Sequence, residues 1–208
     1  MNKPLFTGAC TALVTPFLDG KVNYPMLEQL IRYQMDAGIH TIVLSGTTGE
    51  SATLTDDEKL EIIRRAKQYT GADCTIIAGT GCNSTAHAAR LSFAAEEAGA
   101  DALLIVSPYY NKATPEGLYA HYLTIAKTVS IPIIAYNVPG RTGVDIPVSV
   151  YEQLNEIPNI VGMKEAAADI TKITRICRSC DKMTAWTGSD DLTVAAIALG
   201  AEGVISVL

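Results

Sequence analysis

The chain contains eight short and almost wholly apolar segments, which alternate with segments of helical periodicity. Apolar segments without polar alternation are typical of strands that are buried on both faces, as in a parallel sheet covered by helices. Strict alternation of strands and helices predicts either a (β/α)8 barrel or a doubly wound sheet. The expected strands cover residues 8–16, 41–45, 75–78, 102–107, 131–136, 160–166, 184–187 and 203–208.

Local capping signals place helices between these strands. Thr55 with Glu58 three residues later is a capping box, and Thr114 followed by Pro115 is typical of a helix start. Seven helices therefore separate the eight strands, and a glycine fingerprint for dinucleotides is missing, which favours the barrel. We predict an α/β fold, a (β/α)8 TIM barrel. The remaining helix starts are expected at Asn23, at Ser84 or Thr85, at Pro147, at Asp169 and at 188–190.

The predicted barrel forms a single domain over residues 1–208, with no linker or low-complexity segment to divide it. A barrel of this kind has an eighth helix after its last strand, and about 250 residues are typical. In this chain the expected last strand, 203–208, ends the sequence. We therefore expect a chain that lacks the eighth helix and is incomplete at its C-terminus.

Composition excludes several other classes of protein. A hydrophobic content of 48% is incompatible with disorder, and no apolar run approaches the ~18 residues of a membrane span. The net charge of −6 argues against a nucleic-acid or anionic-membrane partner. Five cysteines cannot all pair, and Cys177 and Cys180 have no second pair at zinc-site spacing. We expect no metal site, and reduced thiols in a cytoplasmic protein.

Lys164 interrupts the apolar strand expected at 160–166, near its C-terminal end. An isolated ammonium is costly to bury, and burial lowers the pKa of a lysine until the amine is neutral. A neutral amine can attack a ketone to form a Schiff base. Two simpler interpretations remain open at this point: Lys164 pairs with Glu165, or its side chain extends to solvent at the strand end.

Polar side chains gather at the C-terminal ends of the expected strands, where (β/α)8 enzymes have their active sites. Phenols beside an amine suit imine formation with proton transfer, and a guanidinium suits bidentate binding of a carboxylate. Together they indicate an anionic carbonyl substrate. Each residue alone has a structural alternative: a turn-capping threonine, a core or interface tyrosine, a solvated arginine. The residues at the strand ends are Thr47, Thr48, Tyr110, Tyr136, Arg141, Lys164 and Gly188.

Four motifs of the sequence resemble those of the dihydrodipicolinate synthase family, within the pyruvate-dependent class I aldolases. They are GTTGE at 46–50, SPYYN at 107–111, AYNVPGRTG at 135–143 and VGMKEA at 161–166. The resemblance implies a (β/α)8 barrel that is followed in the family by a C-terminal helical extension, which this chain lacks. It also implies condensation of pyruvate with L-aspartate 4-semialdehyde to 4-hydroxy-tetrahydrodipicolinate, in the diaminopimelate route to lysine.

The resemblance implies a role for each site residue. Lys164 matches the lysine that forms the imine with pyruvate, so that no cofactor is needed, and Tyr136 matches the tyrosine that passes protons to the bound intermediates. Thr47 and Tyr110 match its proton-relay partners, with Tyr110 reaching in from a neighbouring subunit. Substrate-binding positions are matched by Thr48, Ile205, Gly188 and Arg141, of which Arg141 would hold the carboxylate of the aldehyde. A homo-oligomer, a tetramer built from dimers, is implied as well.

Lysine-inhibited members of the family bind lysine in a pocket at a subunit interface. His87 stands where sensitive members carry an acidic residue for the ammonium of the ligand, and Asp56 and Lys59 stand where those members often have histidines. We therefore expect weak inhibition by lysine or none. The residues that fit such a pocket are Ser51, Ala52, Asn83 and Tyr109, with His87 as the exception.

Three alternative functions are weighed against this interpretation. An N-acetylneuraminate lyase would share Lys164 and Tyr136, but GTTGE and the Arg141 loop favour the synthase. A non-catalytic fragment is suggested by the expected missing end. A phosphate-binding barrel isomerase would need glycine-rich cradles after the last two strands, whereas Asp190 places an acid after the seventh.

Overall fold

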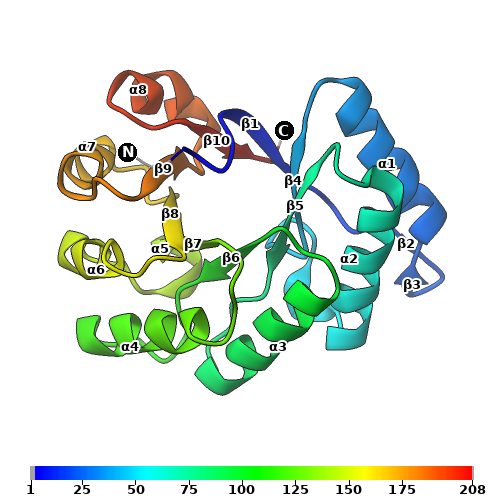
Figure 1. Ribbon diagram of the computed structural model, residues 1–208, viewed down its shortest axis with the longest axis horizontal. Coiled ribbons are helices and arrows are strands. Elements are labelled where there is room, and N and C mark those ends of the chain that lie inside the picture. The colour runs from blue at the N-terminus through cyan, green and yellow to red at the C-terminus, as the bar shows by residue number, and fades with distance from the viewer. Residues whose placement is uncertain (1–2, 208) are drawn as a thin grey trace.

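The computed structural model describes residues 3–207, which form a closed barrel of eight parallel strands (Figure 1). The strand order around the barrel is β1-β10-β9-β8-β7-β6-β5-β4, and β1 closes the ring by pairing with both β10 and β4. This confirms the predicted (β/α)8 class. The barrel strands are β1 (Gly8–Ala12), β4 (Thr41–Leu44), β5 (Thr75–Gly79), β6 (Ala102–Val106), β7 (Ile133–Asn137), β8 (Ile160–Glu165), β9 (Thr184–Thr187) and β10 (Gly203–Ser206).

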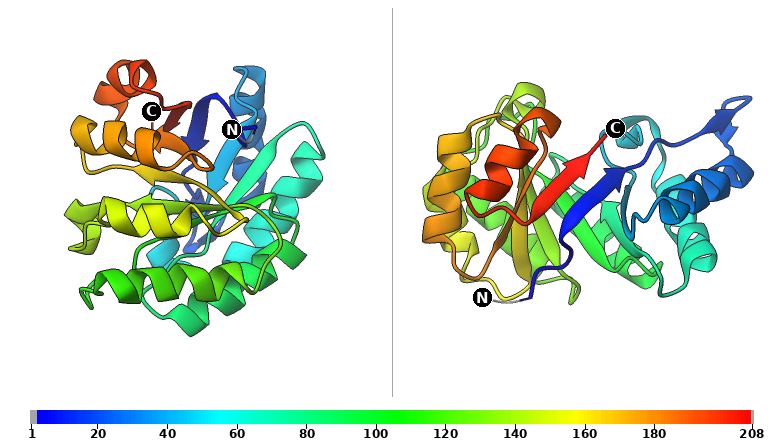
Figure 2. Two further views of the ribbon diagram at one scale, coloured as in Figure 1. Left: turned by 60° about the vertical axis from the view of Figure 1, so that its left-hand side comes forward. Right: turned by 90° about the horizontal axis from the view of Figure 1, so that it is seen from above.

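Helices flank the strands as an outer layer in both further views (Figure 2). The predicted N-caps at Asn23, Ser84, Thr114 and Asp169 are confirmed, and Thr55 with Glu58 forms both hydrogen bonds of a capping box. None of these helices, within the described residues, has the length and apolar character needed to cross a membrane. The helices are α1 (Tyr24–Asp36), α2 (Asp56–Thr70), α3 (Thr85–Glu97), α4 (Pro115–Ala126), α6 (Val148–Leu154), α7 (Ile170–Ser179) and α8 (Thr193–Ala198).

Several expected boundaries were wrong. The first strand ends at Ala12, and a separate hairpin of β2 (Phe17–Leu18) and β3 (Lys21–Val22) follows it. The Asp19-Gly20 turn, with positive φ at both residues, is the turn type that suits such a hairpin. The expected last strand ran to residue 208, which lies outside the described residues.

Two loops at the C-terminal ends of the strands hold short helices that were not expected. The loop after β7 contains the single turn α5 (Pro139–Thr142), and a 3₁₀ turn, η1 (Ser51–Thr53), precedes α2. The helix expected from 188–190 onward is divided into a 3₁₀ turn, η2 (Asp190–Leu192), and α8. These turns shape the rim of the barrel where the polar residues gather.

The interior of the barrel is filled by side chains from alternate strand positions. At its N-terminal end, Phe6 stacks on Trp186 with ring centroids 4.7 Å apart, and the indole nitrogen of Trp186 donates to the Phe6 carbonyl at 3.3 Å. Cys10, Ile205 and Trp186 are fully buried in this inner cluster. The inner cluster therefore closes the floor beneath the polar rim.

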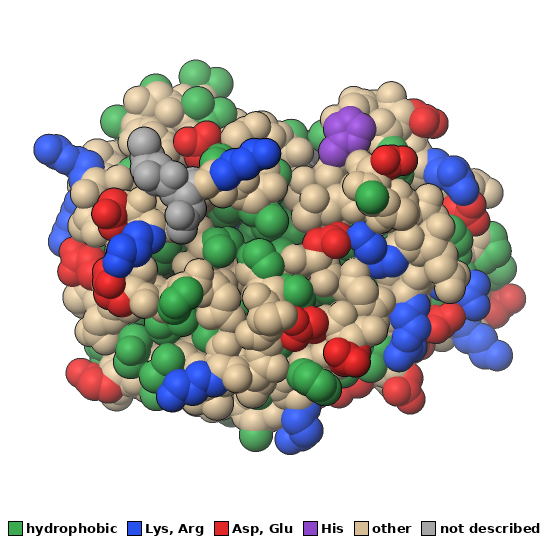
Figure 3. Space-filling view, viewed as in Figure 1, with side chains coloured by type: hydrophobic (Ala, Val, Ile, Leu, Met, Phe, Trp, Pro, Cys, Tyr) green, Lys and Arg blue, Asp and Glu red, His purple; other side chains and the backbone are tan. Residues whose placement is uncertain are grey.

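On the face shown in Figure 3, acidic and basic side chains are interspersed over the surface.

Of the apolar residues near the end of the chain, Val204 and Ile205 are buried, whereas Val207 is 55% exposed. The last strand is thus packed into the barrel through its first three residues, including Gly203.

Closure of the barrel depends on a glycine at position 203. A Cβ atom built there would lie 1.9 Å from the carbonyl oxygen of Gly8 on the neighbouring strand β1. We predict that Gly203→Ala lowers the free energy of unfolding by at least ~3 kcal/mol, the upper end of what overpacking costs.

Urea denaturation of this variant is to be compared with that of Gly117→Ala in α4. A Cβ at Gly117 makes ordinary contacts of 3.5 and 3.8 Å, so this control is expected to be neutral, or stabilised by up to ~1 kcal/mol. Equal denaturation midpoints for the two variants would contradict the prediction.

Candidate active site

Lys164 lies inside the barrel near the C-terminal end of β8, between Tyr136 of β7 and Trp186 of β9. Its side chain is 4% exposed, and its Nζ atom lies 4.6 Å from the centre of the Tyr136 ring. Burial lowers the pKa of Lys164 from its ordinary value of 10.5 to about 8. Cys10 and Asp190 act in the opposite direction, and the positive charge of Arg141 lowers the pKa further.

The pairing of Lys164 with Glu165 that the sequence left open does not occur. Successive residues of a strand point to opposite faces, and Glu165 therefore points out of the barrel, toward the helices. There its Oε2 atom lies 3.3 Å from the Nζ of Lys172, and its Oε1 atom accepts from Asn137 at 2.7 Å. Nor does the Lys164 side chain extend to solvent. The amine is thus left inside the barrel, available as a nucleophile when neutral.

Tyr136 is the residue opposite Lys164 on the neighbouring strand and is 7% exposed. Burial raises the pKa of the Tyr136 phenol, while a hydrogen bond with the Thr47 side chain and the charge of Arg141 oppose the rise. A phenol that stays protonated and is hydrogen-bonded to a second hydroxyl can pass a proton in either direction.

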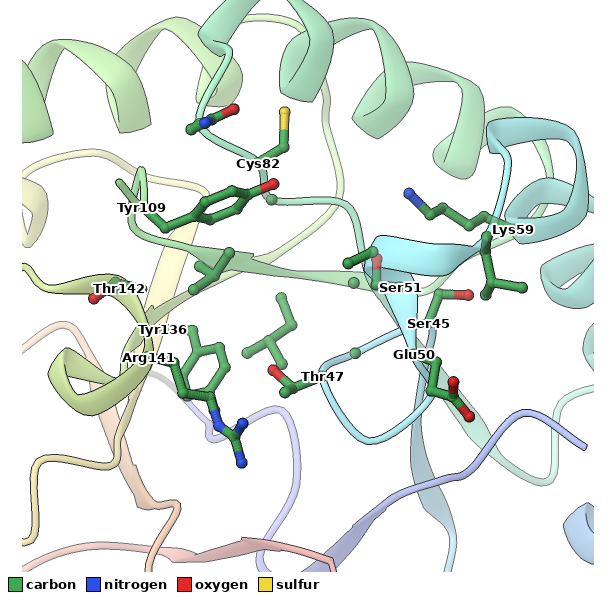
Figure 4. A pocket seen from close by; sticks show the side chains of 18 of the residues that line it. Ser45, Thr47, Glu50, Ser51, Lys59, Cys82, Tyr109, Tyr136, Arg141 and Thr142 are labelled. Carbon is green, nitrogen blue, oxygen red and sulfur yellow. The ribbon is translucent and has the colours of Figure 1, made fainter. Parts of the chain in front are cut away.

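Arg141 belongs to the single-turn helix α5 after β7, and its side chain is exposed. In Figure 4, Arg141 and Tyr136 lie on one side of the pocket, with Thr47 close to both. The three side chains come from two neighbouring loops and a strand end. The structure therefore brings together a hydroxyl, a phenol and a guanidinium beside the buried amine.

The remaining substrate-binding candidates occupy different positions. A Cβ atom at Gly188 would lie 2.7 Å from the Cε of Lys164, so that glycine is needed there to leave room for the amine side chain. Ile205 is fully buried in the inner cluster that also contains Tyr136. Thr48 is half-buried, and Gly188 is half-buried as well.

Tyr110 does not join the site within this chain. Its side chain is 89% exposed and its φ angle is +72°, a left-handed conformation that is uncommon for a residue with a bulky side chain. The backbone nitrogen of Tyr110 donates to the Thr142 carbonyl at 3.3 Å, which ties its loop to the one that carries Arg141.

A cavity of about 530 Å³ opens beside these residues and continues toward α2 and α3. Thr47, Tyr136 and Arg141 line one part of it. The cavity is not lined by the other candidate residues of the site, which are Lys164, Thr48, Gly188, Ile205 and Tyr110. The cavity therefore reaches part of the expected active site and all five residues of the expected regulatory pocket: Ser51, Ala52, Asn83, His87 and Tyr109.

Charges in the second part of the cavity are arranged around Asp56. Its carboxylate lies 2.6 Å from the Nε2 of His87 and 3.8 Å from the Nζ of Lys59. Lys59 and Ser51 stand across the pocket from Arg141 in Figure 4. Asp56 is therefore already engaged by two basic side chains.

Sequence reasoning missed the polar residues that support the site from outside the barrel. Asn137, Asp145 and Lys172 all contact Glu165 or one another, and none was singled out as functional. Within residues 3–207, no group of three or more His, Cys, Asp or Glu side chains is placed to hold a metal ion. The five cysteines are unpaired.

The model of the Dihydrodipicolinate synthetase family matches residues 5–208 of the chain. A 4-hydroxy-tetrahydrodipicolinate synthase from Acetivibrio thermocellus is 47% identical over 209 residues, which cover 100% of this chain and 71% of that protein. The chain belongs to the dihydrodipicolinate synthetase family. Membership confirms the resemblance seen in the sequence and makes the protein a lyase of the class I aldolase type.

Two solved structures of the family show the same fold. One is a chloride-inhibited dihydrodipicolinate synthase from Acinetobacter baumannii complexed with pyruvate, with 45% identity, a TM-score of 0.94, and coverage of 97% of this chain and 70% of that one. The other is a dihydrodipicolinate synthase from Cyanidioschyzon merolae with lysine bound, with 40% identity, a TM-score of 0.95, and coverage of 99% and 71%. These names support the synthase over the N-acetylneuraminate lyase, non-catalytic and isomerase alternatives.

The Lys164 amine is predicted to titrate near pH 8. An amine is neutral above its pKa, so the reactive fraction of Lys164 rises as pH passes through about 8, whereas an ordinary lysine is less than ~1% neutral there. Because Asp190 raises the pKa of Lys164, Asp190→Asn is expected to move the midpoint to lower pH.

Competitive labelling with an amine-reactive reagent across pH, read by peptide mass spectrometry, measures both midpoints. Lys182, which lies on the surface and pairs with Glu156 at 2.6 Å, is the internal reference and should titrate far higher. A Lys164 midpoint above pH 10, or an upward shift in Asp190→Asn, would rule out this account of the site.

Proposed function

We propose that the chain catalyses the condensation of pyruvate with L-aspartate 4-semialdehyde to give 4-hydroxy-tetrahydrodipicolinate, the first committed step of the diaminopimelate route to lysine. The observation that carries the proposal is the buried Lys164 amine beside the Tyr136 phenol, in a chain of the dihydrodipicolinate synthetase family. The pyruvate complex of the Acinetobacter baumannii relative supports pyruvate as the first substrate.

The chemistry proceeds through the Lys164 nitrogen. The neutral amine attacks the ketone carbon of pyruvate, and loss of water gives an iminium. The iminium withdraws electrons from the adjacent methyl group, which loses a proton to become an enamine. The enamine carbon then attacks the aldehyde, and the amino group of the second substrate displaces Lys164 as the ring closes. The imine itself serves as electron sink, and we propose that neither a metal nor an organic cofactor takes part.

Each of these steps moves a proton, and we assign that role to hydroxyl groups. Tyr136 stands beside the amine and hydrogen-bonds to Thr47, which extends the path toward the cavity. Tyr110 is assigned as the third member of the relay, contributed by a neighbouring subunit, and its 89% exposure suits that role. A relay of hydroxyls transfers protons without bulk water.

The substrate carboxylates have separate partners in this proposal. Thr48, Ile205 and Gly188 contribute to the pyruvate site, next to the buried amine. Arg141, which is exposed at the cavity, binds the carboxylate of the semialdehyde through a charge-assisted hydrogen bond. The active form is a homo-oligomer, and we propose a tetramer built from dimers. Five unpaired thiols support a cytoplasmic location.

Pyruvate with borohydride is expected to leave a reduced pyruvyl group on Lys164. Peptide mapping after trapping locates the adduct, and Lys172 is the matched control. It is also a buried lysine, but it lies on the outer face of the barrel and is paired with Asp145 and Glu165. An adduct on Lys172, or an adduct that still forms in Lys164→Met, would contradict the assignment of Lys164 as the residue that forms the imine.

Arg141→Ala is expected to raise the KM for the semialdehyde while the KM for pyruvate changes little. Loss of hydrogen bonds to a charged group costs ~1.5–3 kcal/mol, which corresponds to roughly a tenfold to hundredfold rise. Arg141→Lys keeps the charge but loses the bidentate geometry, and should fall between parent and Ala variant. Steady-state kinetics with each substrate varied in turn provide the measurement. An unchanged semialdehyde KM with a raised pyruvate KM would reverse the assignment.

Lysine is expected to inhibit this protein weakly or not at all. A lysine ligand brings two ammonium groups into the cavity, and His87 stands where an acid would compensate one of them. Asp56, the nearest carboxylate to His87, is already held by His87 and Lys59. Without a carboxylate at that position, one ammonium group of the bound lysine has no partner in the pocket, which costs several kcal/mol.

The lysine concentration that gives half-inhibition is measured from initial rates in a lysine titration at saturating pyruvate. We expect half-inhibition above about 1 mM lysine, which corresponds to binding weaker than ~4 kcal/mol. His87→Glu restores a carboxylate and should be more sensitive than the parent. Half-inhibition of the parent at sub-millimolar lysine would refute the expectation and show that another group compensates the ligand.

A further inference from the structure

Asn137 ends β7 and points away from Tyr136, out of the barrel. Its side chain is fully buried, and its amide nitrogen donates to Oδ1 of Asp145 and to Oε1 of Glu165, both at 2.7 Å. Its amide oxygen accepts from the backbone nitrogen of Ile146 at 3.0 Å. One side chain thus joins both ends of the loop 138–145, which carries Arg141, and fastens that loop to the strand of Lys164.

A second contact holds the far end of the same loop. Lys172 of α7 is buried, and its Nζ atom donates to Oδ1 of Asp145 and lies 3.3 Å from Oε2 of Glu165. The Oδ1 atom of Asp145 therefore accepts from both Asn137 and Lys172. Asp145 is the point at which the end of the Arg141 loop meets the buried polar groups of β7, β8 and α7.

Within the loop, short hydrogen bonds make the backbone a compact unit. The Arg141 nitrogen donates to the Val138 carbonyl at 2.9 Å, and the Gly143 nitrogen donates to the Pro139 carbonyl at 2.9 Å. The hydroxyl of Thr142 donates to the Val144 carbonyl at 2.9 Å. A unit of this kind moves with its two ends, and those ends are held by Asn137 and Asp145.

We propose that Asp145 is a positioning residue for the second substrate. By accepting from Asn137 and Lys172, it closes the loop 138–145 and holds Arg141 at the mouth of the cavity. Asp145 does not line the cavity among the described residues, so it acts through the loop rather than by touching a substrate. The kinetic part of this inference rests on the proposed function, and the structural part does not.

The exposure of Asp145 makes the proposal testable without loss of the fold. Its side chain is 57% exposed, and its removal leaves Lys172 with Glu165 as a partner. Removing Asn137 instead would leave Glu165, a fully buried carboxylate, short of a donor. Asp145→Ala is therefore expected to loosen the loop end at residue 145 while the Lys172–Glu165 pair and the hydrogen bond from Ile146 to Asn137 stay intact.

The matched variants separate geometry from charge. Asp145→Asn keeps an Oδ1 acceptor for both Asn137 and Lys172 but removes the negative charge. Asp181→Ala is the control, because Asp181 also accepts from an asparagine amide, that of Asn155 at 3.1 Å, outside the cavity. If Asp145 acts by holding the loop, Asp145→Asn should resemble the parent and Asp145→Ala should not.

The first readout is amide hydrogen exchange of residues 138–146, which needs no activity. We expect exchange to rise about tenfold or more in Asp145→Ala, because the loop opens locally when its closing contacts are removed. Asp145→Asn and Asp181→Ala should remain at the parent level. Unchanged exchange in Asp145→Ala, or equal rises in all three variants, overturns the proposal whatever the enzyme catalyses.

The second readout is the split between kinetic constants. Asp145→Ala should raise the KM for the semialdehyde about tenfold, less than the ~100-fold that a misplacement of 1 Å can cost. The KM for pyruvate and the yield of borohydride adduct on Lys164 should stay within about twofold of the parent. Equal effects on both substrates, or no rescue by Asp145→Asn, overturn the positioning role. If the parent protein forms no pyruvate adduct, the proposed function is refuted instead. The hydrogen-exchange result still tests the structural part of the inference, because it does not depend on activity.

Discussion

The burial of the Lys164 amine is the interaction on which the rest of the site depends. A charged ammonium inside the barrel is costly, and no carboxylate of residues 3–207 forms an ion pair with it. Desolvation instead lowers the pKa of Lys164 to about 8, so that a useful fraction of the amine is neutral near physiological pH. The neighbouring elements preserve this state: Gly188 leaves space for the side chain, and Trp186 and Phe6 close the barrel beneath it.

Because successive side chains of a strand point to opposite faces, β7 and β8 place different polar residues inside and outside the barrel. Tyr136 and Lys164 are register partners that point into the barrel, where the chemistry is proposed to occur. Asn137 and Glu165 are the next register pair and point outward, into a fully buried polar group that includes Lys172. The same strand pair therefore carries the groups of the proposed chemistry on one side and a buried set of polar contacts on the other. Register errors of one residue would exchange the two sets.

The shared cavity follows from the way the loops after β4, β5 and β7 meet at one rim. Thr47 and Ser51 both follow β4 and both line the cavity, but Thr47 lies beside Tyr136 and Ser51 lies on the side of Lys59 (Figure 4). A ligand in the second part would therefore lie on the loop that carries Thr47, a member of the proposed proton relay. This proximity gives a physical route by which occupancy of one part can influence the other.

The sequence by itself determined the class of fold, the helix caps and the identity of the nucleophile candidate. Apolar runs, capping boxes and an isolated lysine are local signals, and they depend on neighbours within a few residues. It did not determine the α5 turn, the division of the last helix, or the partners of Asn137, Asp145 and Lys172. Those contacts join residues 7 to 28 positions apart, so closure of the barrel is needed before they exist. The tertiary structure also decided that Glu165 pairs with Lys172 and not with Lys164, because the pleat of β8 within the closed barrel sends the side chains of residues 164 and 165 to opposite faces.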